Sequence, residues 1–87
     1  MRQYRAETRK PSAGTAELSW EIGAGYVRTA KATVQDESKS GMALLVNLPF
    51  SIEASIQITT GDKTRSAVVR RCIRQGANHL VGVQFQR

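Results

Sequence analysis

The fold of this chain is decided by the stretch SIQITTGDKTRSAVVRRCIRQGANHLVGVQF, residues 55–85. Apolar and polar residues alternate there with the period of two that indicates half-buried β-strands, in the segments Ser55–Thr59, Lys63–Arg74 and Leu80–Phe85. Gly61-Asp62 and Gln75–Asn78 separate them and carry residues typical of tight turns. Strict alternation through the middle segment would place Ala67, Val69, Arg71 and Ile73 on one face, opposite Ser66, Val68, Arg70 and Cys72.

The preceding residues continue this pattern toward the N-terminus. Two more alternating strands are predicted, Ala16–Ile22, with Ala16, Leu18, Trp20 and Ile22 on one face, and Tyr26–Gln35. The continuous apolar run Met42–Val46 predicts a third strand, buried on both faces or at a barrel corner. Gly23-Ala24-Gly25 is suited to the positive φ angles of a hairpin, and the polar run from Asp36 to Gly41 predicts a loop. No window has the apolar spacing of an amphipathic helix. The sequence therefore predicts an all-β domain of about six short antiparallel strands, either a sandwich or, because closure removes exposed strand edges, a small barrel.

Composition limits the function classes. The chain has 87 residues, enough for one domain, and a net charge of +6 with a pI near 10.3, which attracts polyanions such as nucleic acid, anionic lipid or a phosphorylated ligand. Cys72 is the only cysteine and His79 the only histidine of the chain, so neither an internal disulfide nor a Cys/His metal cluster is expected. No apolar run is long enough to span a bilayer and no signal peptide is evident, so a cytoplasmic protein is expected. No catalytic set or cofactor site can be assembled, and no enzyme activity is predicted.

The first candidate binding motif is Arg5-x-x-x-Arg9, flanked by Arg2 and Lys10. The planar fork of an arginine side chain fits phosphate or the O6/N7 edge of guanine bidentately. Two such forks on a flexible segment can close around a ligand that carries both groups. A solvated basic tail is the alternative explanation of the same residues.

The second motif is Asp36-x-Ser38-x-x-Gly41. A carboxylate accepts paired hydrogen bonds from the N1–H and N2–H of guanine, a serine hydroxyl binds phosphate or steadies a turn, and glycine lets the backbone approach a flat base closely. The alternative is a polar hairpin loop in which Asp36 and Ser38 bond to nearby amides.

The order and separation of these two motifs resemble the PilZ family, as do Val68-Val69-Arg70 and the closing Leu80–Phe85. The resemblance covers essentially the whole chain. It implies a six-stranded antiparallel, Greek-key-like barrel (residues 15–87) behind an arginine-rich ligand-binding loop (residues 1–14). It also implies that the chain binds the bacterial second messenger cyclic di-GMP through Arg5, Arg9, Asp36, Ser38 and Gly41, with a protein partner or attached domain receiving the signal.

Two departures from the family pattern bear on this interpretation. Tyr4 stands where members often have a further arginine, which leaves the ligand stoichiometry open, and the chain ends two residues after Phe85 without the C-terminal helix of many relatives. Arg70 or Arg71 is a further candidate for adding charge to the ligand-binding face, although no family motif supports either. Two other functions remain open: a barrel that only binds protein partners, and a basic barrel that binds nucleic acid without sequence preference through exposed residues such as Arg28, Lys31, Arg65 and Arg74.

Overall fold

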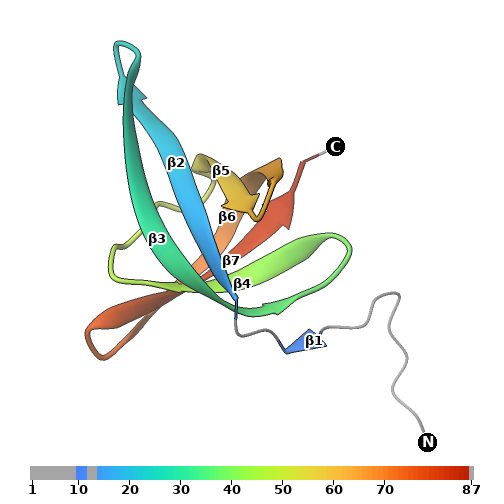
Figure 1. The fold of residues 1–87 in the computed structure, drawn as a ribbon. Coiled ribbons are helices and arrows are strands. Elements are labelled where there is room, and N and C mark those ends of the chain that lie inside the picture. The colour runs from blue at the N-terminus through green and yellow to red at the C-terminus, as the bar shows by residue number, and fades with distance from the viewer. Residues whose placement is uncertain (1–9, 12–13, 87) are drawn as a thin grey trace, which may run out of the picture.

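Seven β-strands and their turns make up the part of the chain that this computed structural model describes, residues 10–11 and 14–86 (Figure 1). The strands are β1 (Lys10–Pro11), β2 (Thr15–Gly23), β3 (Tyr26–Glu37), β4 (Gly41–Val46), β5 (Ser55–Thr60), β6 (Lys63–Gln75) and β7 (Asn78–Phe85). Within these residues no helix is present, and so none is long and apolar enough to cross a membrane.

Six of the strands close into one antiparallel barrel. The order is β3-β2-β5-β6-β7-β4, and an additional pairing of β4 with β3 completes the ring. Strands β2, β3 and β4 follow one another, and β5 returns to lie beside β2, which is the arrangement of a Greek key. The short β1 lies outside the ring against the end of β3, with Lys10 opposite Glu37 and Pro11 opposite Asp36. The predicted six-stranded antiparallel barrel is confirmed.

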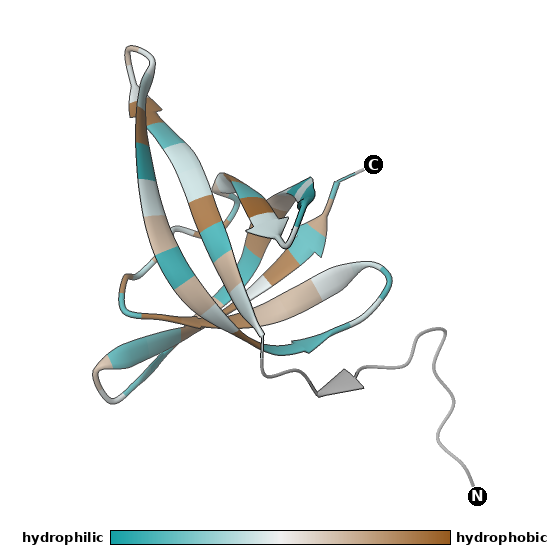
Figure 2. Cartoon of the chain, viewed as in Figure 1, coloured by the Kyte–Doolittle hydropathy of each residue, from teal (hydrophilic) through white to brown (hydrophobic). Residues whose placement is uncertain are grey.

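Hydrophobic and hydrophilic residues alternate along the strands (Figure 2), and the buried members of this pattern fill the barrel. Among the residues whose side chains the structure describes, fourteen apolar ones are buried, and Leu18, Leu44, Val69 and Val81 are the largest of those fully enclosed. Each lies on a different strand, so four sides of the ring contribute to the centre of the core. Burial of one such side chain stabilises the fold by about 1.5–3 kcal/mol.

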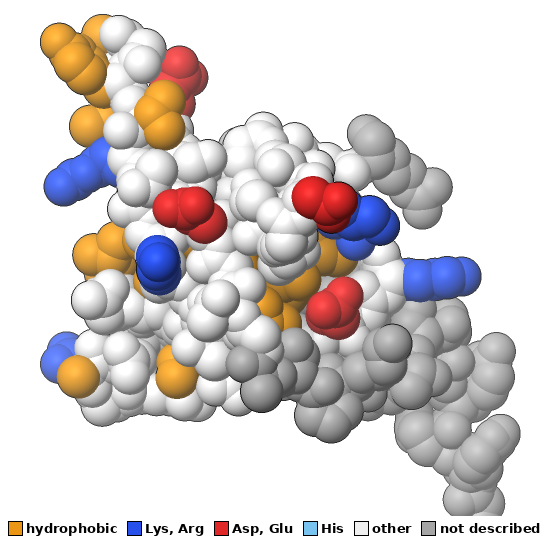
Figure 3. All heavy atoms as spheres, in the orientation of Figure 1, with side chains coloured by type: hydrophobic (Ala, Val, Ile, Leu, Met, Phe, Trp, Pro, Cys, Tyr) orange, Lys and Arg blue, Asp and Glu red, His pale blue; other side chains and the backbone are white. Residues whose placement is uncertain are grey.

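The β2–β3 hairpin extends beyond this core. Strand β2 pairs with β5 only from Glu17 to Ser19, so the remainder of the hairpin has no neighbour on that side among the described strands. Trp20 still packs edge-on against Phe50, with ring centroids 4.8 Å apart, and both contact the core. Beyond Trp20, hydrophobic side chains gather at the tip of the hairpin (Figure 3), where Ile22 is 56% exposed.

The regular pairing of the described strands is interrupted near the β2–β3 turn, between Glu21 and Gly23, and by two β-bulges farther along the chain. One lies in β3 between Val34 and Asp36, the other in β6 between Val69 and Arg71. At a bulge, two residues of one strand lie opposite a single residue of its neighbour. All later residues of the bulged strand are therefore shifted by one position relative to that neighbour. The prediction that residues alternate strictly between the two faces of β6 is therefore wrong after Val69. Cys72 packs against the core, and Ile73 is exposed.

Candidate functional site

The Asp36-x-Ser38-x-x-Gly41 motif spans the hairpin that joins β3 to β4. Asp36 belongs to β3 and Gly41 begins β4, so the predicted loop is shorter than the sequence indicates, and both residues are fixed by strand pairing. The backbone N–H of Ser38 donates to the carbonyl of Gly41 over 2.9 Å and closes the turn. The preceding carbonyl, that of Ser40, accepts the N–H of Phe85 at 2.7 Å. Backbone bonds from two strands thus hold the motif in place.

Ser38 is the one polar residue among the described side chains that is buried, at 8% exposure. Its Oγ is enclosed and has no hydrogen-bond partner within the described structure. The turn is closed by the Ser38 backbone rather than by its hydroxyl, contrary to one of the two roles considered for this side chain. A buried hydroxyl without a partner costs about 1–3 kcal/mol, so its presence requires an explanation other than stability.

Replacing Ser38 by alanine is expected to cause no loss of stability and to raise the free energy of unfolding by up to about 1 kcal/mol, because the enclosed hydroxyl loses hydration without gaining a bond. Urea denaturation followed by tryptophan fluorescence measures this change. Loss of more than about 1 kcal/mol would show that the hydroxyl is hydrogen-bonded in the folded protein.

Gly41 has a steric role that the sequence does not reveal. A Cβ built on this residue would collide with the backbone carbonyl oxygen of Val83 on β7. The close approach of β4 and β7 at this point therefore requires glycine, whichever ligand the neighbouring surface binds. Access to a flat base was the expected reason for this residue, and the contact with β7 is an additional one.

An open groove of about 670 Å³ lies on the barrel surface next to the motif. Its lining comes from β3, β4, β6 and β7, and includes Asp36, Gly41, Ala43, Arg70, Arg71 and Gly82. Two of the predicted site residues, Asp36 and Gly41, thus share a surface with two arginines that lie some 30 residues later in the sequence. One carboxylate and two guanidinium groups give this groove the donors and acceptors that a guanine nucleotide requires.

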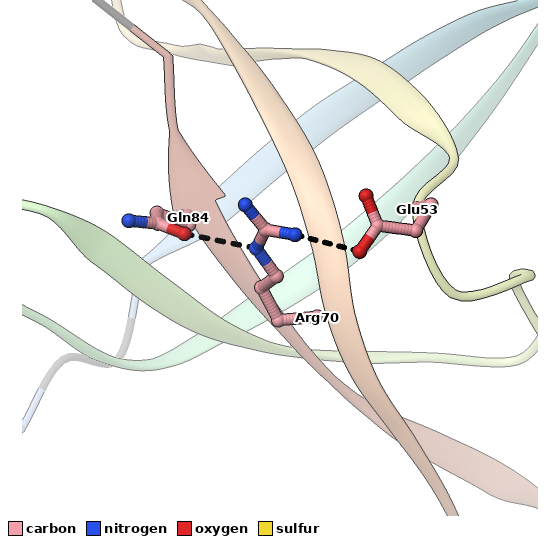
Figure 4. A network of polar contacts seen from close by, with 3 residues as sticks. All are labelled: Glu53, Arg70 and Gln84. Atoms are coloured by element: carbon pink, nitrogen blue, oxygen red, sulfur yellow. Dashed lines mark hydrogen bonds and ion pairs between the residues drawn. The ribbon is translucent and has the colours of Figure 1, made fainter.

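Arg70 is held at one side of this groove by two polar contacts (Figure 4). Its Nε donates to Oε1 of Gln84 over 2.9 Å, and its Nη1 donates to Oε2 of Glu53 over 2.6 Å. The ion pair is exposed, with 50% and 67% of the two side chains accessible, so it contributes little to stability. Its effect is to orient Arg70 toward the β4–β5 connection.

A second groove, of about 540 Å³, runs along β3 and the end of β4. Lys31 is the sole charged residue among the described residues that line it. The groove beside Asp36 is the better candidate for an anionic guanine nucleotide, because it presents a carboxylate and two guanidinium groups where the second groove presents one lysine.

Arg5 and Arg9, the other predicted contacts, lie outside the described residues, as does Tyr4. The chain enters the described structure at β1, where Pro11 is opposite Asp36. Gly14 follows, and its carbonyl accepts the N–H of Val34 at 2.8 Å. The described start of the chain therefore runs along the same end of β3 that carries the Asp36 motif.

Cys72 and His79 have no described neighbours with which to form a metal site, since no group of three or more His, Cys, Asp or Glu side chains occurs between residues 14 and 86. Cys72 is a free, partly buried thiol on β6. His79 lies on β7, and its Nδ1 is enclosed without a hydrogen bond to any described residue. Both are strand residues.

Comparison with known proteins places the fold. No family model matches the chain, and no curated protein matches it either. Among solved structures, MrkH of K. pneumonia in complex with c-di-GMP superposes with a TM-score of 0.67 at 19% identity, over 98% of this chain and 45% of that one. The PilZ domain of YcgR from Escherichia coli with c-di-GMP gives a TM-score of 0.64 at 16% identity, over 98% of this chain and 79% of that one. The chain thus spans less than half of the length of MrkH, and it has the fold of a PilZ domain.

Proposed function

We propose that this chain is a receptor for cyclic di-GMP that binds the ligand in the groove beside Asp36. The observation that carries the proposal is the convergence of Asp36 and Gly41 with two arginines on one surface of a barrel. Two solved structures with this fold contain c-di-GMP, which supports the choice of ligand. The function is that of a receptor rather than an enzyme, with no cofactor beyond the ligand itself.

In this proposal Asp36 accepts hydrogen bonds from N1–H and N2–H of a guanine. Its backbone is fixed by pairing with Ala43 of β4 and Pro11 of β1, so the carboxylate is presented from a rigid position. Preorganisation of this kind lowers the entropy lost on binding.

Ser38 takes part by rotating its side chain. A change of χ1 would turn the unpartnered Oγ out of its enclosed position and toward a ligand phosphate or ribose. The unsatisfied hydroxyl favours such a rotation, because the ligand supplies the bond that the described structure lacks. Gly41 contributes by keeping the turn close to β7.

Residues 1–14 form the second half of the proposed site, with Arg5 and Arg9 as its ligand contacts. Arg9 directly precedes β1 in the sequence, and β1 pairs with the residues of β3 that carry Asp36. This connectivity supports a site assembled from both motifs. Residues 15–87 would be the barrel domain.

Ordering of residues 1–14 by the ligand would change the surface that a protein partner or an attached domain contacts. The 45% coverage of MrkH is consistent with such a module acting beside other domains. Because cyclic di-GMP is a bacterial second messenger, the proposal implies a bacterial protein that acts in the cytoplasm.

Titration calorimetry with cyclic di-GMP tests the proposal, with GTP and cyclic GMP as control ligands. The unmodified chain is expected to bind cyclic di-GMP but neither GTP nor cyclic GMP. The Asp36→Ala variant is expected to bind cyclic di-GMP at least tenfold more weakly, because both guanine hydrogen bonds are lost. Asp62→Ala removes the same charge from an exposed turn and is the matched control.

Two results would contradict the proposal: absence of binding by the unmodified chain, or equal affinity of the Asp36 and Asp62 variants. Binding of single-stranded nucleic acid with a steep salt dependence would instead favour a basic nucleic-acid-binding barrel, because many phosphate contacts release many counterions.

A further inference from the structure

Two β-bulges, one on β3 and one on β6, lie on the strands that form the two sides of the groove. On β3, Val34 is opposite Leu44 and Asp36 is opposite Ala43, so Gln35 is the extra residue. On β6, Val69 is opposite Val83 and Arg71 is opposite Gly82, so Arg70 is the extra residue. Bulges are frequent beside binding sites, where they change the direction of a side chain.

Together the bulges align four residues in a row across four neighbouring strands. Ala43 of β4 and Gly82 of β7 are opposite each other in the middle, Asp36 of β3 flanks Ala43, and Arg71 of β6 flanks Gly82. Neighbouring strands lie about 4.8 Å apart, so the row is roughly 14 Å long. Without the bulges, Gln35 and Arg70 would stand at its ends.

The row has a charged residue at each end, and its two middle residues, Ala43 and Gly82, are small and form the floor of the groove between them. Ala43 carries a methyl group and Gly82 no side chain, and both line the groove together with Asp36 and Arg71. The Arg71 side chain extends over the floor, because a Cβ on Gly82 would lie 3.6 Å from its Cβ and 3.8 Å from its Nε. A nucleotide that lies on this floor can meet the carboxylate at one end and the guanidinium at the other.

Arg71, unlike Arg70, is available to a ligand. Arg70 is occupied by Glu53 and Gln84, whereas the Arg71 guanidinium makes no hydrogen bond or ion pair with any residue of the described segments. A guanidinium already positioned beside the site gains a phosphate contact without first breaking an ion pair.

We propose that Arg71 is an additional ligand contact that binds a phosphate of the cyclic dinucleotide while Asp36 holds the guanine of the same nucleotide. This inference rests on the proposed function. It assigns the β6 side of the groove to a residue that belongs to neither sequence motif. It also orients the bound nucleotide, with its guanine at β3 and its phosphate at β6.

Calorimetric titration of Arg71→Ala with cyclic di-GMP tests the assignment, and the affinity is expected to fall at least tenfold, or by about 1.4 kcal/mol. Arg74→Ala is the matched control: Arg74 is exposed on the same strand, its Nε donates to the Gly76 carbonyl at 3.1 Å, and it does not line the groove. The control removes the same charge and is expected to change the affinity less than twofold.

Arg71→Lys separates a phosphate contact from a contact with guanine. Lysine binds phosphate as a point charge, whereas bidentate pairing with the O6/N7 edge of guanine requires the arginine fork. Affinity within about threefold of the unmodified chain is expected for Arg71→Lys. An affinity as low as that of Arg71→Ala would overturn the phosphate assignment.

The outcomes distinguish this inference from the proposed function. If the unmodified chain binds and the Arg71→Ala and Arg74→Ala variants bind equally well, the Arg71 contact is refuted and the receptor function stands. If the unmodified chain does not bind cyclic di-GMP, both are refuted. Equal thermal midpoints of the variants exclude a loss of affinity through unfolding.

Discussion

Replacing Arg5 and Arg9 together by alanine is expected to lower the affinity for cyclic di-GMP at least a hundredfold. Each guanidinium is proposed to make charge-assisted bonds to guanine or phosphate, and loss of one such contact costs about 1.4 kcal/mol or more, which is tenfold in affinity. Isothermal titration calorimetry of the two single variants and the double variant measures the effect. Each single variant is expected to lose at least tenfold.

The control for this experiment is a double variant that removes the same charge elsewhere. Arg28→Ala with Arg74→Ala also lowers the net charge by two from +6, and both residues are exposed on the barrel. If the two double variants lose affinity equally, the contribution of Arg5 and Arg9 is a general attraction of anions. Unchanged binding by the Arg5 and Arg9 variants would remove residues 1–14 from the site.

Replacing Gly41 by alanine is expected to destabilise the barrel by about 2 kcal/mol. The new Cβ would collide with the backbone oxygen of Val83, and a backbone atom in a paired strand cannot move aside as a flexible side chain does. Overpacking of this kind typically costs about 1–3 kcal/mol. In a domain of this size, each kcal/mol lowers the melting temperature by roughly 4–8 °C, which differential scanning calorimetry resolves readily.

Gly82→Ala provides the matched control, because it adds the same methyl group on the strand that β4 contacts. There the Cβ would meet Arg71 at the ordinary contact distance of 3.6 Å, so the melting temperature is expected to change little. A Gly41→Ala variant as stable as Gly82→Ala would show that β4 and β7 separate easily at this point. Glycine would then have to be explained by ligand access.

The short-range pattern of the sequence predicted most of the architecture. Alternation located five of the barrel strands because each buries one face, and a continuous apolar run located the sixth, Met42–Val46. The turn residues separated them, and Gly23 and Gly25 have the positive φ angles expected for the β2–β3 turn. The spacing of the Asp36 motif also located one side of the groove. Each of these features depends on residues that are close in the sequence.

The role of Arg71 is different, because it depends on pairing between distant strands. Counting by two from Val69 places Arg71 toward the core, where an unpaired charge is not tolerated. Two adjacent arginines between the buried Val69 and the partly buried Cys72 were the available signal of a bulge. That signal does not say which arginine would face the groove.

By itself, the sequence determined an all-β chain, the number of its barrel strands and the position of its two motifs, since side-chain alternation and turn chemistry act over a few residues. Only the tertiary structure decided that Asp36 and Arg71 face each other across Ala43 and Gly82. The physical reason is that a bulge arises from the register of one strand against its neighbours, which a strand's own residues do not specify. The requirement for glycine at Gly41 has the same origin, because it is set by the backbone of β7, some 40 residues later in the chain.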